Sequence, residues 1–140
     1  MQAQNCSNYP ASWRHMESAG DFLTPDYYRR IARALEDGKF HFGFFDDRLA
    51  LPDIYGADHK EAVKNGIRVV KMDPIPILAT MAMSTTHLGL AATLSTTYYE
   101  PFHIARTMMT LDHMTGGRAG WNVVTSLNDS EAFNMGAKST

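Results

Sequence analysis

The chain has 140 residues, of which 44% are hydrophobic and 20% charged, a composition that excludes intrinsic disorder as the default. Its formal net charge of −2 and the absence of any basic run exclude a charged surface for nucleic acid. No apolar run approaches the roughly 20 residues that span a bilayer, and residues 1–15 lack the apolar core of a secretory signal. With Cys6 as its single cysteine, we expect a cytoplasmic protein with neither membrane nor nucleic-acid partners.

The first half of the chain predicts one helix, one strand and a long loop. Thr24-Pro25-Asp26 is typical of a helix start with Thr24 as the N-cap, and Gly38 is a plausible end of that helix. The aromatic run 40–45 predicts a buried strand that ends in two aspartates. Residues 48–72 then predict a loop without regular structure, which is uncommon in a compact domain unless it is functional. It could be part of a lid over a site, although a plain surface loop is favoured slightly.

The second half repeats the order of helix and strand twice. Asp73-Pro74 opens a helix predicted to reach about residue 86, and residues 87–94 predict a strand with both faces covered. Glu100-Pro101 opens the next helix, which Gly116-Gly117 ends, and residues 119–125 predict the last strand. Residues 128–130 suggest one more turn. This order favours the α/β class, with parallel strands and right-handed crossovers. If it belongs to a (β/α)8 barrel, which needs about 250 residues, most of the barrel is missing.

Small polar residues gather where the predicted strands end. In a parallel sheet these ends lie at one face, which is the face where ligands bind. Each side chain also has an ordinary structural explanation, because carboxylates cap loops and hydroxyls satisfy nearby backbone groups. Asp46 should point away from its neighbour and is a weaker candidate. The candidates are Asp47 after the first strand, Thr93 in the second, and Asn122, Thr125 and Ser126 around the end of the third.

Several common functional motifs are absent from the sequence. No Gly-x-Gly-x-x-Gly follows a strand, so the dinucleotide fingerprint is missing. The six histidines form no metal-binding pattern. Ser126 lies in no Gly-x-Ser-x-Gly turn, which argues against a serine hydrolase.

Two segments resemble one family of enzymes. Residues 39–51, KFHFGFFDDRLAL, resemble the strand-two segment of the flavin monooxygenases related to nitrilotriacetate and dibenzothiophene-sulfone monooxygenases. Residues 93–126, TLSTTYYEPFHIARTMMTLDHMTGGRAGWNVVTS, resemble the same family more specifically, as do Trp13-Arg14 and the run from 126 to 136. The family belongs to the bacterial-luciferase-like group of (β/α)8 barrels. The resemblance implies that residues 1–140 are the amino-terminal part of one such TIM barrel domain, with roughly strands two to four.

The resemblance also implies a chemistry. Such enzymes take reduced FMN (FMNH2) from a separate NAD(P)H-dependent flavin reductase and insert one oxygen atom of O2 into a small organic substrate. Asp47 and Thr93 match positions that contact FMN, and Asn122 matches an amide near the flavin ring. We place Thr125 with these cofactor-binding residues. Ser126 matches a hydroxyl near flavin and substrate and is the catalytic candidate. We also expect a homo-oligomer.

Other functions stay open at this point. The chain could be a truncated, non-catalytic α/β module that self-associates or needs a partner chain, since three strands leave two open edges. Hydride transfer with a deazaflavin is less favoured, because the segment WNVVTS resembles the monooxygenases more closely. The sequence does not identify the substrate. Because the family's phosphate-binding motif lies outside these 140 residues, we expect the chain alone to bind FMN weakly or not at all and to have no turnover.

Overall fold

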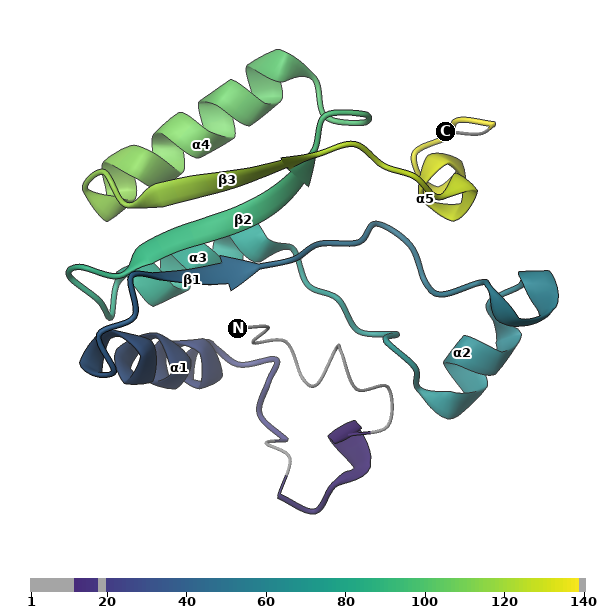
Figure 1. Ribbon diagram of the computed structural model, residues 1–140, viewed down its shortest axis with the longest axis horizontal. Helices are drawn as coiled ribbons and strands as arrows, with labels where there is room; N and C mark the ends of the chain where they lie inside the picture. The colour runs from purple at the N-terminus through teal and green to yellow at the C-terminus, as the bar shows by residue number, and fades with distance from the viewer. Residues whose placement is uncertain (1–11, 18–19, 139–140) are drawn as a thin grey trace.

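The molecule is built on a three-stranded parallel sheet (Figure 1). The computed structural model describes residues 12–17 and 20–138, so Cys6 lies outside the described part. The strands are β1 (Phe42–Phe45), β2 (Gly89–Ser95) and β3 (Ala119–Val124), in the order β1-β2-β3. The predicted parallel α/β arrangement is therefore confirmed.

Three longer helices accompany the strands: α1 (Pro25–Asp37), α3 (Pro74–Ala82) and α4 (Pro101–Thr115). Each begins with a proline, whose missing N–H has no partner to lose at a helix start. The Thr24 hydroxyl caps α1 by accepting the Tyr27 N–H, and Asp73 caps α3 by accepting the Ile75 N–H. The starts of all three helices agree with the prediction. In the region that the structure describes, no helix is long and apolar enough to cross a membrane.

The end of α3 differs from the prediction. The helix stops at Ala82 and not near residue 86. The carboxylate of Glu36 accepts the backbone N–H groups of residues 86–88, and the guanidinium of Arg118 donates to the carbonyls of residues 82, 85 and 88. These bonds hold the segment in a non-helical conformation, because they occupy the groups that a longer helix would pair internally.

The loop predicted over residues 48–72 also differs. It contains a 3-10 turn, η2 (Tyr55–Ala57), and a short helix, α2 (Lys60–Asn65). Gly66 ends α2 in the left-handed conformation, with φ of 64°. Figure 1 shows α2 beyond the carboxyl end of β1, well away from the sheet. A six-residue helix shows less than two turns of hydrophobic periodicity, so the sequence pattern did not reveal it.

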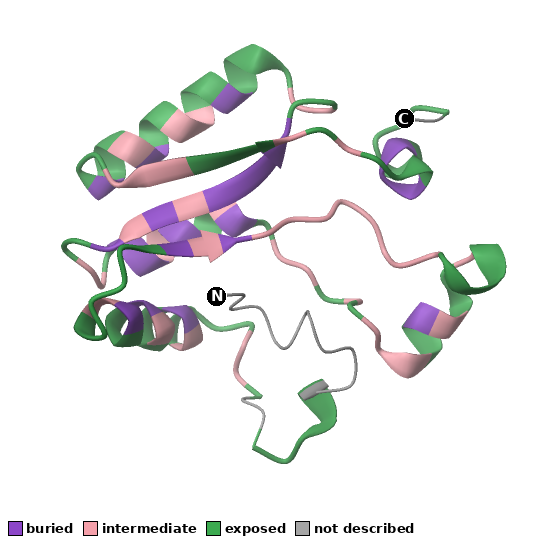
Figure 2. Ribbon diagram, viewed as in Figure 1, coloured by how far each residue is buried: buried purple, intermediate pink, exposed green. Residues whose placement is uncertain are grey.

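The core lies between the helices and one face of the sheet. Figure 2 shows buried residues along β2 and on the helix sides that face it. Buried side chains alternate with less buried ones in β1 and in the first half of β2, as the two-residue period of a strand requires, and residues 92–95 of β2 are all buried. The main contributors are Tyr28, Ala32 and Leu35 from α1, Phe45 from β1, Leu78 and Met81 from α3, Leu90 and Ala92 from β2, and Leu111 from α4.

The opposite face of the sheet carries small residues beside large ones. A Cβ atom added to Gly89 would lie 3.0 Å from the Cβ of Phe42, and one added to Gly120 would lie 3.0 Å from the Cβ of Ala91. A side chain at either glycine would therefore crowd the residue beside it on the neighbouring strand. Phe42 on this face is 60% exposed, since no helix among residues 12–17 and 20–138 covers it. The last helix, α5 (Asp129–Asn134), lies beyond the carboxyl end of β3 (Figure 1).

Candidate functional site

A cavity of about 360 Å3 opens where the three strands end. We call it the strand-end cavity. Its volume falls within the range of small-molecule sites, roughly 300–1,000 Å3. Its wall combines apolar side chains with hydroxyl, amide and carboxylate groups. Its lining includes Phe44, Asp46 and Asp47 from β1 and its loop, Thr93 and Ser95 from β2, Asn122, Val124, Thr125, Ser126 and Leu127 from β3 and its loop, and Glu131 from α5.

A chain of hydrogen bonds crosses all three strands at the floor of this cavity. The side-chain amide of Asn122 donates to the hydroxyl of Thr93 at 3.1 Å, and that hydroxyl donates to the carbonyl of Phe45 at 3.0 Å. Thr93 and Asn122 are direct partners in the register of β2 and β3. The bond from Nδ2 fixes the orientation of the Asn122 amide. No hydrogen bond to its Oδ1 is formed among the described residues, so this oxygen can accept one from a ligand.

A second set of bonds fixes the position of Ser126. Its backbone N–H donates to the Thr97 hydroxyl at 3.0 Å, and its own Oγ lies 2.9 Å from Oγ of Ser95. Ser95 is only 5% exposed, and its Oγ accepts the Thr97 N–H at 3.2 Å. Either hydroxyl can be the donor in the pair of Ser95 and Ser126. In the arrangement in which Ser95 donates, Ser126 can donate its own proton to another acceptor.

Asp47 stands between two cavities. Its Oδ1 accepts the Arg48 N–H at 2.8 Å. Asp47 therefore caps its own loop, which is the structural role that the sequence analysis gave as the alternative to ligand binding. Burial raises the pKa of this carboxyl group to about 6, against the lowering effects of the Arg48 N–H and the charge of Lys71. Asp47 lines the strand-end cavity and also an adjoining cavity of about 300 Å3, which includes Tyr99. It is therefore a half-buried acceptor at a place that a ligand can reach.

The structure brings together all five residues that the sequence singled out. Asp47, Thr93, Asn122, Thr125 and Ser126 line one cavity at one end of the sheet, although their role in binding stays a proposal. The guanidinium of Arg48 pairs with the carboxylate of Asp53, at 4.0 Å, and not with Asp47.

Sequence reasoning was less successful for two acidic residues. Asp46 was expected to point away, yet it lines the same cavity and pairs with Lys71 at 2.8 Å. The chain leaves the strand at Phe45, so the alternation of a strand no longer applies to Asp46. Glu131 was not a candidate, because it reaches the cavity from a helix far along the chain. Ser95, in contrast, could be found from the sequence, because it lies two residues after Thr93 in a strand and its side chain therefore points to the same face of the sheet.

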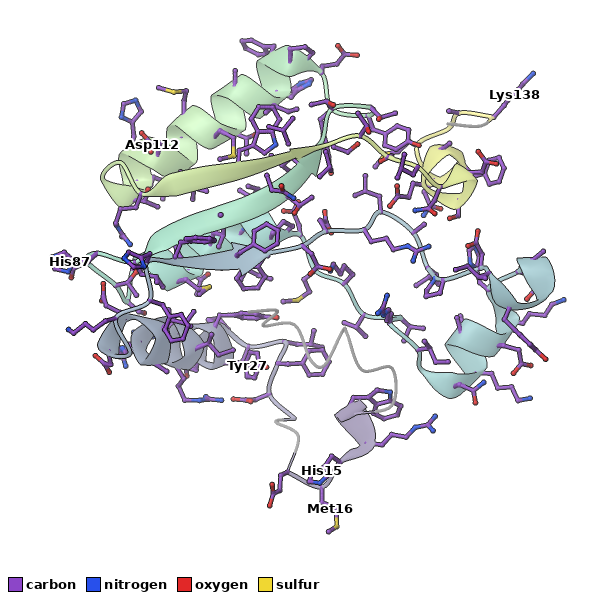
Figure 3. The ribbon with its side chains drawn as sticks, in the orientation of Figure 1. His15, Met16, Tyr27, His87, Asp112 and Lys138 are labelled. Atoms are coloured by element: carbon purple, nitrogen blue, oxygen red, sulfur yellow. The ribbon has the colours of Figure 1, made fainter. Side chains whose placement is uncertain are left out.

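The histidines do not gather into a metal site. Figure 3 shows His15 and His87 far from each other, with His87 at the end of the sheet opposite to the strand-end cavity. Among residues 12–17 and 20–138, no group of three or more histidine, cysteine or acidic side chains could hold a metal ion.

Parallel strands joined by helices define an α/β protein, and its polar cavity lies at the carboxyl ends of the strands, where such folds bind ligands. Residues 6–139 match the family model described as "Luciferase-like monooxygenase". The chain belongs to this family, as the resemblance predicted.

Curated relatives agree with this assignment. The chain is 50% identical over 135 residues to the dibenzothiophene-sulfone monooxygenase of Rhodococcus erythropolis, covering 96% of the chain and 30% of the relative. It is 41% identical over 129 residues to nitrilotriacetate monooxygenase component A of Aminobacter aminovorans, covering 89% of the chain and 28% of the relative. The chain thus spans about 30% of the length of these relatives.

Solved structures show the same correspondence. The crystal structure of a long-chain alkane monooxygenase superposes with a TM-score of 0.87 at 39% identity, covering 93% of this chain and 30% of that one. A riboflavin lyase structure with modified FMN and riboflavin also gives 0.87, at 35% identity, covering 99% of this chain and 31% of that one. The three strands and their helices therefore correspond to part of the (β/α)8 barrel of these proteins.

Proposed function

We propose that this chain provides the amino-terminal part of an FMNH2-dependent monooxygenase, with residues 1–140 forming part of one barrel domain. The observation that carries the proposal is the strand-end cavity, where five side chains chosen from the sequence meet in a member of the luciferase-like family. A solved relative with modified FMN supports flavin as the ligand. Asp47, Thr93, Asn122 and Thr125 are the proposed flavin-binding residues.

The chemistry of the cavity wall fits the flavin ring. An isoalloxazine presents carbonyl oxygens, ring nitrogens and an N–H along its edge, and an apolar face. The cavity offers Oδ1 of Asn122 and the carboxylate of Asp47 as acceptors, and the Thr125 and Ser126 hydroxyls as donors. Phe44, Val124 and Leu127 provide apolar surface between these polar groups. A small number of polar groups on an apolar wall is typical of cofactor sites.

In this proposal each side chain has a limited task. Bound FMNH2 supplies the electrons with which O2 is activated. Thr93 orients Asn122 through the bond to its amide nitrogen, and Asn122 accepts a hydrogen bond from the ring edge. When Ser95 donates in its pair with Ser126, the Ser126 hydroxyl is available to donate to an acceptor atom in the cavity. Ser126 is the proposed catalytic residue because the family resemblance assigns its hydroxyl a position near flavin and substrate.

The proposed partners follow from the relatives. One relative is named as component A of nitrilotriacetate monooxygenase, which supports a separate NAD(P)H-dependent flavin reductase as the source of FMNH2. The named relatives act on an aromatic sulfone, a long-chain alkane or an aminopolycarboxylate. We therefore propose a small organic substrate and do not narrow its class further.

The proposal is tested by adding FMN, up to millimolar concentration, to the 15N-labelled chain and recording NMR shifts residue by residue. This measurement detects the weak binding expected of the chain alone. Shifts should concentrate at the five proposed residues, and riboflavin should reproduce them because the ring makes the contacts. Residues at the other end of the sheet, such as His87 and Arg118, serve as the control. Shifts that concentrate there contradict the proposal.

The competing function is a non-catalytic module that covers its open strands with a second copy. The exposed Phe42 on the uncovered sheet face favours this alternative. Analytical ultracentrifugation separates the two. Tight self-association that blocks the FMN-induced shifts favours the module, whereas shifts that persist in the monomer favour the flavin site.

A further inference from the structure

Helix α5 holds one peptide of the loop that follows β1. The carboxylate Oε1 of Glu131 accepts the Leu49 N–H at 3.1 Å, and the side-chain amide of Asn134 donates to the Leu49 carbonyl at 2.7 Å. Both the donor and the acceptor of Leu49 are thus bonded to side chains more than 80 positions away in the sequence. We call this arrangement the Leu49 clamp.

The spacing of the two side chains suits this task. Glu131 and Asn134 are three residues apart, which puts them on the same face of α5. Glu131 is only 6% exposed, and Ala132 beside it is fully buried, so α5 is seated firmly. The carboxylate of Glu131 lines the strand-end cavity, and Asn134 lines the adjoining one. The clamp therefore lies in the wall between the two cavities.

The clamp also connects the two outer strands of the sheet. β1 and β3 are not neighbours, because β2 lies between them. α5 follows β3 directly, and Leu49 follows β1 by four residues. Figure 1 shows the loop after β1 passing next to α5 at the carboxyl end of the sheet. The clamp thus closes the side of the strand-end cavity that no strand borders.

We propose that Glu131 and Asn134 are positioning residues that hold Asp47 at the wall of the strand-end cavity. Asp47 is two residues before Leu49, and its own Oδ1 fixes the intervening Arg48 N–H. With the amides of residues 48 and 49 both bonded, the segment has little freedom to turn the Asp47 side chain into solvent. The importance of this position for flavin binding rests on the function proposed above, but the clamp itself can be tested without flavin.

The experiment compares four variants of the chain by NMR. Glu131→Ala and Asn134→Ala each remove one bond to Leu49, while Glu131→Gln removes only the charge and keeps an acceptor oxygen in place. Phe133→Ala is the matched control, since Phe133 lies on the same helix and is 61% exposed. The first measurement is the hydrogen exchange of the Leu49 N–H. The second is the titration of the Asp47 carboxyl carbon, whose charged or titratable surroundings are Asp46, Arg48, Arg68, Lys71, Asp73, Tyr99 and Glu131.

We expect Glu131→Ala to speed exchange of the Leu49 N–H by about tenfold or more, because its acceptor is gone. Asn134→Ala should move the Asp47 midpoint from about 6 toward its ordinary value, because a released loop exposes the carboxyl group. Glu131→Ala should move this midpoint further than Glu131→Gln does, because both variants lack the Glu131 charge and only the alanine variant also frees Leu49. Glu131→Gln should leave the exchange of the Leu49 N–H as in the unaltered chain, and Phe133→Ala should leave both measurements so. If Glu131→Ala folds but shows the same Asp47 midpoint as Glu131→Gln, the proposal is wrong.

Two further outcomes are equally decisive. If Phe133→Ala changes both measurements as much as Asn134→Ala does, α5 acts by general packing and the proposal is overturned. If the variants free Leu49 and Asp47 but the FMN-induced shifts lie outside the five site residues, the clamp stands and the flavin function fails. Where Glu131→Ala does not fold, Asn134→Ala decides the question, because Asn134 is exposed and the change adds no charge.

Discussion

The two ends of the sheet use their polar side chains in different ways. At the amino end, the guanidinium of Arg118 donates to the carbonyls of Ala82, Thr85, Leu88 and Thr115 and to the Thr85 hydroxyl. At the carboxyl end, Asn122 bonds to Thr93 through its amide nitrogen and keeps its amide oxygen for the cavity, while the Ser126 hydroxyl, which is bonded to Ser95, lines the cavity. Polar groups at the amino end are thus committed to the fold, and those at the carboxyl end have capacity left for a ligand.

The acidic residues show the same contrast. Glu36, near the amino end, accepts backbone N–H groups, and these bonds, that of His87 foremost, lower the pKa of its carboxyl group. At the carboxyl end, burial raises the pKa of Asp47. Glu36 therefore favours the folded state when it is charged, whereas Asp47 carries its charge at a cost. A carboxyl group whose pKa is raised by burial, as that of Asp47 is, is a common feature of functional sites.

The largest expected effect belongs to the amino end. Arg118→Ala should lower the free energy of unfolding by about 3 kcal/mol, because several part-buried carbonyls lose their donor. Urea denaturation measures this change. Arg106→Ala on exposed α4 surface is the control, and it should stay within about 0.5 kcal/mol. Equal midpoints for the two variants would show that the Arg118 bonds contribute little to the fold.

Thr93→Val should have the next largest effect. The change keeps the shape of the side chain but leaves the Phe45 carbonyl and the Asn122 amide nitrogen without partners. We expect a loss of about 2 kcal/mol, since Thr93 is 5% exposed and unpaired buried groups are costly. The exposed Thr96, whose hydroxyl donates to the Val124 carbonyl, gives the matched Thr96→Val control with a smaller loss. If both variants unfold at the same urea concentration, the bond chain across the strands is not cooperative.

Much of the fold could be predicted because its signals are local. The helix starts at Pro25, Pro74 and Pro101 combine a capping residue with a proline, and both act within a few residues of the chain. The site residues Asp47, Thr93 and Asn122 could be grouped because strand ends of a parallel sheet share one edge. Family resemblance added their proposed roles, which strand geometry alone does not supply.

The parts that sequence reasoning missed depend on long-range contacts. The end of α3 is set by Glu36 and Arg118, and neither lies within that helix. The cavity wall at Glu131 depends on its contact with Leu49, 82 residues away. Such contacts leave no periodic pattern in the sequence, so one sequence without structural information does not reveal them.

Asp47→Asn tests the cost of charge at the carboxyl end. A pKa raised to about 6 means that the folded state binds the proton more tightly than the unfolded state does. The stability of the unaltered chain should therefore fall as pH rises from about 4 through 6, while the asparagine variant lacks this fall. A rise of the Asp47 pKa to about 6 corresponds to at most about 3 kcal/mol of stability, and solvent screening reduces this to about 1 kcal/mol.

The measurement for Asp47→Asn is urea denaturation at pH 4 and at pH 7. The variant should match the unaltered chain at the lower pH and exceed it at the higher pH. Glu36→Gln provides the opposite case, because the stabilisation from a lowered pKa is lost as pH falls. If Asp47→Asn shows no advantage at pH 7, Asp47 is not buried at a cost. In a protein with flavin turnover, Asp47→Ala should also weaken FMN binding.

Ser126→Ala should have the smallest effect on stability and a distinct effect on function. Removing the hydroxyl costs about 0.5 kcal/mol, because one part-buried hydrogen bond is lost and little space is created. In a protein with turnover, the variant should change the rate of flavin oxidation more than FMN affinity, since a hydroxyl beside the proposed flavin site is lost. Stopped-flow absorbance measures the first quantity and fluorescence quenching the second. Thr96→Val, which leaves the bond between Ser95 and Ser126 intact, should change neither. Unaltered flavin oxidation in Ser126→Ala removes the serine from the catalytic site and leaves Asn122 and Asp47 as binding residues only.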